Sequence, residues 1–156
     1  MRRFALLLAA LVLTGCATSP TLSLPPTTQL LLLGEQHDAP AHQEWERGTV
    51  QQLAIRQQLA AVVMEMAEAG RSTAGLPATA SEAQARTALA WDDAAWPWAK
   101  YGPVAMAAVR AGVPVLGGNL PRAQMRQAMQ DTRFDTHLPP AALQRQYEAL
   151  RTGHCG

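Results

Sequence analysis

Four side chains that can carry chemistry lie between positions 35 and 42, namely Glu35, His37, Asp38 and His42. Alternate residues of an extended chain point to the same side, so Glu35 and His37 can face one another. A carboxylate beside an imidazole can share a metal ion with it, or it can orient the imidazole as a ligand. The same spacing also suits polar residues that leave a sheet into water. Residue types alone do not separate these interpretations.

The other two groups have more ordinary interpretations beside the functional one. His42 can turn back toward Glu35 and His37, or it can be a solvated histidine near the start of a helix. Asp38 stands two residues before Pro40, a pattern typical of a helix N-cap followed by proline in the first turn. We therefore interpret Asp38 as a cap rather than as a ligand.

Two further polar residues follow apolar runs. Glu65 comes directly after residues 61–64 in "VVMEM". An ionised carboxylate at the end of a buried strand needs a partner, because desolvation alone is expensive; the alternative is a surface glutamate at the start of a loop. Asn119, in "GGNLP", can offer its amide to a ligand, or it can be a turn residue.

An aromatic segment adds candidates for holding a flat ligand, namely Trp91, Trp96, Trp98 and Tyr101. Large planar side chains in an irregular segment can wall a pocket, and a tyrosinate can ligate ferric haem. Lys100, the only lysine, could pair with an anionic ligand group such as a propionate. A satellite core under a long loop accounts for the same aromatic residues equally well.

Apolar runs and glycine or proline breaks predict the elements that must position these groups. The predicted strands are residues 29–33, 61–64 and 113–117, and the predicted helices are residues 41–59, 81–90, 104–111, 121–130 and 140–151. Strands that alternate with helices indicate an α/β fold, a mostly parallel sheet flanked by helices. Ligands of such sheets bind beyond the carboxyl ends of the strands, where Glu35, Glu65 and Asn119 are expected to gather.

The first residues of the chain predict export. A basic start and the short apolar stretch 4–13 precede Leu13-Thr14-Gly15-Cys16, which resembles a bacterial lipobox. We expect residues 1–15 to be a lipoprotein signal peptide and Cys16 to carry the acyl chains, palmitate among them, that anchor the protein to a membrane. Residues 16–28, rich in Pro, Ser and Thr, are expected to form a tether. Ala17 favours delivery to the outer membrane.

Composition and motif absences narrow the remaining classes. The formal net charge is +1, with no basic stripe, so nucleic acid is not an expected partner. The sequence contains no G-x-S-x-G elbow, P-loop, G-x-G-x-x-G, H-E-x-x-H or C-x-x-C-H. These absences argue against a serine hydrolase, a nucleotide enzyme and a c-type cytochrome. Cys155 would be the one unpaired thiol if Cys16 is lipidated.

Four stretches in order, "LLLLGEQHDAPAHQ", "VVMEM", "W…W…YGPV" and "AGVPVLGGNLPR", resemble the ChaN family of haem-binding lipoproteins in the Tiki/erythromycin-esterase-like superfamily. The resemblance implies a haem-binding α/β domain over residues 29–156 and a role in haem or iron uptake at the bacterial envelope. Glu35, His37 and Glu65 match the superfamily's GxxH-plus-glutamate pattern. Tyr101 matches the tyrosine of the aromatic segment and is a candidate haem contact.

The resemblance also leaves an alternative. In relatives that hydrolyse substrates, the positions of Glu35, His37 and Glu65 are taken to bind a divalent metal or to act as acid and base, so a metal-dependent hydrolase is the rival. Ala39 replaces the asparagine usual in the family pattern. Relatives run further beyond residue 156, so an incomplete version of the domain is expected. The implied arrangement is periplasm-facing and lipid-anchored, with haem bound by one chain or between two copies in a homodimer.

Overall fold

The structure, a computed structural model, describes residues 22–153 and divides the chain into two units at Leu32 and Leu33. Residues 22–32 of the first unit contain a turn and no helix or strand. The predicted signal peptide, Cys16 and Cys155 lie outside the described residues. Within the described part, no helix is both long enough and apolar enough to cross a membrane.

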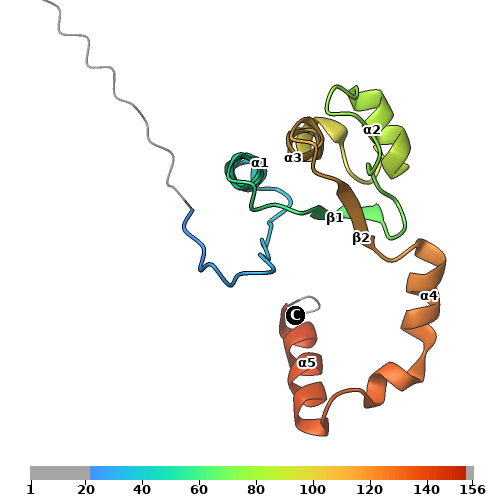
Figure 1. The fold of residues 1–156 in the computed structure, drawn as a ribbon. Helices are drawn as coiled ribbons and strands as arrows, with labels where there is room; N and C mark the ends of the chain where they lie inside the picture. Colours follow the sequence, from blue (N-terminus) through green and yellow to red (C-terminus); the bar gives the residue numbers. More distant parts are fainter. Residues whose placement is uncertain (1–21, 154–156) are drawn as a thin grey trace, which may run out of the picture. The chain divides into compact units, whose positions relative to one another are not determined.

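Every helix and strand of residues 22–153 belongs to the second unit (Figure 1). The elements are α1 (Pro40–Ile55), β1 (Val62–Glu68), α2 (Glu82–Leu89), α3 (Trp98–Arg110), β2 (Val115–Asn119), α4 (Arg122–Gln130), the 3-10 helix η1 (Thr132–Thr136) and α5 (Pro140–Gly153). The two strands pair in parallel, which confirms the predicted α/β class with a parallel sheet.

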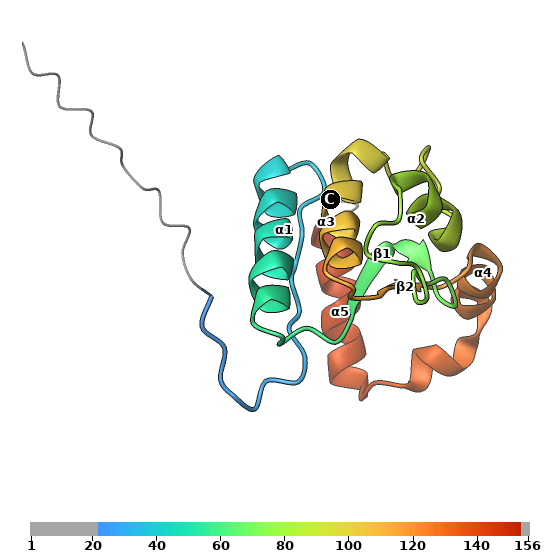
Figure 2. The same ribbon diagram turned by 45° about the horizontal axis from the view of Figure 1, so that its top comes forward.

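Helix α3 is the centre of the packing. It lies between α1 and α2 and contacts both strands (Figures 1 and 2). Ala105 and Ala108 are fully buried, because small side chains on α3 let neighbouring elements approach closely. The largest fully buried side chains of the core are Tyr101, Leu89, Met106 and Val115. Burial of these groups from three elements, α2, α3 and β2, provides the main apolar stabilisation of the fold.

The register of β1 against β2 is regular at first and irregular later. Val62 pairs with Val115 and Met64 with Gly117, and the register then shifts between Met64 and Glu68. A side chain at Gly117 would overlap the carbonyl oxygen of Glu68, so only glycine fits this close approach. The irregular part of β1 is the part beyond the predicted strand, which was expected to end at residue 64.

Residues 29–33 are not a strand, which corrects the first predicted strand. Leu30 is 72% exposed and Leu32 is 81% exposed. An apolar run has the right composition for a buried strand, but a strand exists only where a neighbour pairs with its N–H and C=O groups. Within residues 22–153 the paired strands are therefore two rather than the expected three.

The start of α3 also differs from prediction, because helix was expected only from residue 104. The helix begins at Trp98 and contains Pro103. Proline lacks the N–H of one helical hydrogen bond, yet its fixed φ is compatible with helix, and packing of the apolar helix compensates. Tyr101 is consequently a helical residue, and the expected irregular segment is confined to residues 91–97.

Capping residues account for the ends of the other helices. Ser81 caps α2 in a capping box with Gln84, at the start of the helix predicted for residues 81–90. Helix α1 ends at Ile55 rather than at residue 59, because Gln57 adopts a left-handed backbone with φ of 57°. Helices α4 and α5 match their predicted ranges closely, and neither contains a buried residue.

Candidate functional site

The loop before α1 is held by backbone geometry and by one histidine. Ala39 is the N-cap of α1 and adopts an extended conformation, as expected for a residue before Pro40. No side chain caps this helix, so the prediction that Asp38 is the cap was wrong, because the proline places the cap one residue later. The backbone N–H of Gln36 donates to Nδ1 of His42 at 3.0 Å, which closes the loop.

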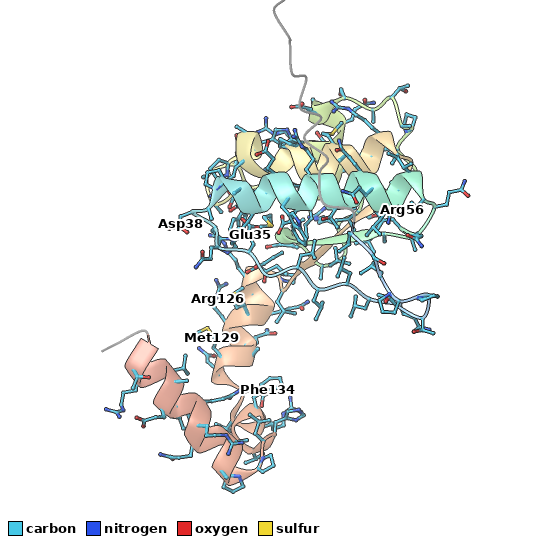
Figure 3. The ribbon with its side chains drawn as sticks, turned by 90° about the vertical axis from the view of Figure 1, so that its left-hand side faces the viewer. Glu35, Asp38, Arg56, Arg126, Met129 and Phe134 are labelled. Carbon is cyan, nitrogen blue, oxygen red and sulfur yellow. The ribbon has the colours of Figure 1, made fainter. Side chains whose placement is uncertain are left out.

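Glu35 is the buried anchor of the site. Its side chain is only 7% exposed and lies beside the first turns of α1 (Figure 3). The carboxylate accepts a hydrogen bond from Nε2 of Gln43 on α1 and one from the hydroxyl of Tyr101 on α3. Its Oε1 also lies 3.5 Å from Nδ1 of His37. Two packed helices thus fix one carboxylate against one imidazole.

The imidazole of His37 is accessible to solvent and lies against two aromatic rings. Its side chain is 46% exposed. The ring meets Trp96 edge-on at a centroid distance of 5.0 Å and Tyr101 at 6.4 Å, and these two rings lie 5.6 Å apart. We call Glu35, His37, Trp96 and Tyr101, together with Glu46, the His37 cluster.

The predicted aromatic cluster divides into two groups. Trp91 and Trp98 pack edge-to-face at 4.9 Å on the side of α2, where Trp98 Nε1 donates to Glu82 at 2.9 Å. Trp96 and Tyr101 instead face His37. Trp91 Nε1 donates to the carbonyl of Trp96 at 2.7 Å and so links the two groups. Trp98 and Tyr101 are core residues, as the core interpretation expected, and Trp96 packs beside His37; whether these rings wall a ligand pocket stays a prediction.

Tyr101 is 1% exposed and does not face solvent. Burial raises the pKa of its phenol above the ordinary value, and the charge of Glu35 and the hydrogen bond to Glu35 raise it further. The carboxylates of Glu46 and Glu65 add smaller effects in the same direction. Lys100 lies over the Tyr101 ring, with Nζ 5.5 Å from the centroid. Tyr101 thus acts on the site through the hydrogen bond that its hydroxyl donates to Glu35.

Glu46 belongs to the site and was not predicted. Its side chain is half-buried on α1. Burial and the nearby charge of Glu35 raise its pKa to about 7, while His37 acts in the opposite direction. The available signal was its spacing, because residues 43 and 46 share one helix face. Gln43 was missed for the same reason, since an uncharged glutamine in a helix has no distinctive pattern.

The structure brings together only some of the predicted site residues. Glu65 is an exposed residue inside β1 rather than at its end, so it needs no partner to offset desolvation. Asn119 does end β2, where its carbonyl accepts from the N–H of Ala69 at 2.7 Å, away from the contacts of the His37 cluster. In residues 22–153, no three His, Cys, Asp or Glu side chains form a group that could hold a metal ion.

Comparison with known proteins identifies a family. The family model described as "Haem-binding uptake, Tiki superfamily, ChaN" matches residues 26–151. No curated protein and no solved structure matches the chain. The matched range contains every residue of the His37 cluster.

Proposed function

The chain belongs to the ChaN family of haem-binding uptake proteins in the Tiki superfamily, and from this premise we propose that it binds haem at the His37 cluster. The observation that carries the proposal is a half-exposed imidazole set edge-on against Trp96 and backed by a buried carboxylate. A protein imidazole is a common axial ligand of haem iron, and aromatic walls suit a flat macrocycle.

The donors present fit such a ligand. His37 is the exposed nitrogen donor of the cluster, and Glu35 behind it supplies the acceptor that orients a metal-binding imidazole. Bound haem would supply a redox-active iron; the chain's own residues bind it, orient it and limit access of water. Tyr101 acts indirectly, because its ring is buried and its hydroxyl is engaged with Glu35.

Lys100 places a cation against the His37 cluster. It is half-buried, with its ammonium group over Tyr101. Haem carries two propionates, so a lysine at the edge of the site would contribute charge pairing as well as contact area. We assign Lys100 to propionate recognition, and its contribution is expected to weaken as salt concentration rises.

We further propose that the protein works at the bacterial envelope in haem or iron uptake, anchored by lipid on Cys16 in the outer membrane and facing the periplasm. The support is the lipobox-like run Leu13-Thr14-Gly15-Cys16 with Ala17 after it. Expression with labelled palmitate should give a labelled protein in the membrane fraction. Cys16→Ala should abolish the label; a label retained in this variant would reject the assignment.

Titration of the purified protein with haemin tests the binding proposal. We expect a shifted Soret band that saturates, and a much weaker response from His37→Ala. The matched control is His137→Ala, which removes an exposed histidine that does not belong to the His37 cluster. A folded protein that gives no Soret shift would reject haem binding, and equal loss in both variants would reject the assignment to His37.

A further inference from the structure

The side-chain amide of Gln43 is buried, and one hydrogen bond offsets the cost of its desolvation. The residue is 5% exposed, and its Nε2 donates to Glu35. Its Oε1 is buried and has no hydrogen-bond partner within the described part of the chain. Burying an amide without hydrogen-bond partners is costly. The hydrogen bond to Glu35 is therefore the interaction that offsets this cost.

The two donors to Glu35 come from different helices. Gln43 belongs to α1 and Tyr101 to α3, and these helices pack against each other. Two donors restrict the rotation of the carboxylate, so its Oε1 stays opposite Nδ1 of His37 at 3.5 Å. A fixed negative charge at this position favours the imidazole tautomer that carries its proton on Nδ1. The lone pair of that tautomer is then on Nε2.

We propose that Gln43 is a positioning residue for His37, which acts through Glu35 to keep the imidazole in the tautomer with a free Nε2 lone pair. That lone pair is the group a haem iron would use, so the identity of the ligand rests on the proposed function. The tautomer itself does not, because it follows from contacts within the protein alone. Gln43 touches no ligand in this scheme; its effect passes through the carboxylate.

Nitrogen-15 NMR of the histidine side chains in the haem-free protein tests the tautomer directly. In mildly alkaline buffer, where imidazoles are neutral, His37 should show a protonated Nδ1 and an unprotonated Nε2. Gln43→Met keeps the length of the side chain but removes the amide, and it should shift His37 toward a mixture of tautomers. Gln51→Met changes an exposed glutamine of the same helix and should leave the spectrum unchanged.

Haemin titration of the same variants gives the second readout. Loss of a residue that orients a metal-binding histidine typically costs about tenfold or more in affinity. We expect a rise of about tenfold in the haemin dissociation constant for Gln43→Met and none for Gln51→Met. If the wild type binds no haemin, the proposed function fails while the NMR result still decides the role of Gln43. An unchanged His37 tautomer in folded Gln43→Met would overturn the inference.

A second variant covers the case in which Gln43→Met does not fold. The exchange Glu35→Gln with Gln43→Glu keeps an amide and a carboxylate in contact but moves the charge away from His37. The inference expects a folded protein in which His37 has lost its tautomer preference. Retention of the wild-type tautomer in this variant would contradict it, because the charge on residue 35 would then be irrelevant to the imidazole.

Discussion

Nδ1 of His37 lies 3.5 Å from Oε1 of Glu35, and the glutamate side chain is 7% exposed while the histidine side chain is 46% exposed. The distance is at the outer limit for a hydrogen bond, so the relationship is chiefly electrostatic. Because the carboxylate is buried, its charge is weakly screened and acts strongly on its neighbours. One buried charge thus influences both an exposed imidazole and a buried phenol.

Removal of the Glu35 charge should be visible at Tyr101. Glu35→Gln should lower the pKa of Tyr101 toward its ordinary value, because Glu35 raises it both by its charge and by its hydrogen bond. The measurement is a spectrophotometric titration of tyrosinate in a Tyr147→Phe background, in which Tyr101 is the remaining tyrosine. Glu65→Gln is the control and should lower it less, since Glu65 is the weakest of these influences. Equal effects of the two variants would contradict the assigned geometry.

Glu46 should make stability depend on pH. Burial and the nearby charge of Glu35 raise its pKa from the ordinary value of 4.5 to about 7 in the folded protein. Between these values the unfolded chain releases a proton that the folded chain keeps, so the free energy of unfolding should fall as pH rises from 4.5 to about 7. Partial exposure limits the effect to about 1 kcal/mol.

Urea denaturation across this pH range is the measurement for Glu46. Glu46→Gln cannot ionise and should be the more stable protein at neutral pH, with a flatter dependence. Glu44→Gln, an exposed residue of the same helix, should keep the slope of the wild type. The assignment would be contradicted if the wild type became more stable as pH rises from 4.5 to about 7 and Glu46→Gln showed the same dependence.

Trp96 should contribute to ligand binding through its contact with His37. Edge-to-face aromatic pairs contribute about 0.5–1.5 kcal/mol, so Trp96→Ala should weaken haemin binding about three- to tenfold. Trp96→Phe keeps an aromatic ring and should retain most of the affinity. Trp45→Ala, at a 49% exposed position of α1, is the matched control and should bind normally. Similar losses at positions 45 and 96 would argue for a general effect on folding.

The close contact of the two strands should make Gly117 intolerant of any side chain. A Cβ there would overlap the carbonyl oxygen of Glu68, which is backbone and cannot move aside. Gly117→Ala should lower the free energy of unfolding by about 1–3 kcal/mol. Gly48→Ala, on α1 with nothing within 4 Å of the new Cβ, should raise it by about 0.5–1 kcal/mol. Thermal melts of the two variants that shift in the same direction would contradict the strand geometry.

Local signals in the sequence were enough to predict much of the fold. The helical patterns predicted for residues 81–90, 121–130 and 140–151 depend on near neighbours in the chain, and the structure has a helix in each of these ranges. The strand predicted at residues 29–33 was wrong, because a strand forms only beside another strand, and composition does not show whether one is present. The prediction that α3 begins only after Pro103 was also wrong, because packing stabilises this helix by more than the proline destabilises it.

The candidate site was predictable only in part. Glu35 and His37 are two residues apart, so their proximity follows from local geometry. Gln43 and Glu46 lie near this pair because α1 packs against α3. Packing between helices is tertiary structure, which no local sequence pattern predicts. Glu65 was misplaced because β1 continues to Glu68, so a supposed strand exit became an exposed position within the strand.

The central claim, that His37 supplies the nitrogen that holds haem, is tested most directly by His37→Gly with and without added imidazole. Glycine leaves room for a free imidazole beside Trp96, where the native ring lies at 5.0 Å. We predict that the variant loses the Soret spectrum of the haemin-bound wild type and regains it when imidazole is added. A His37→Gly protein that binds haemin with the wild-type spectrum and affinity, in the absence of imidazole, would contradict the claim.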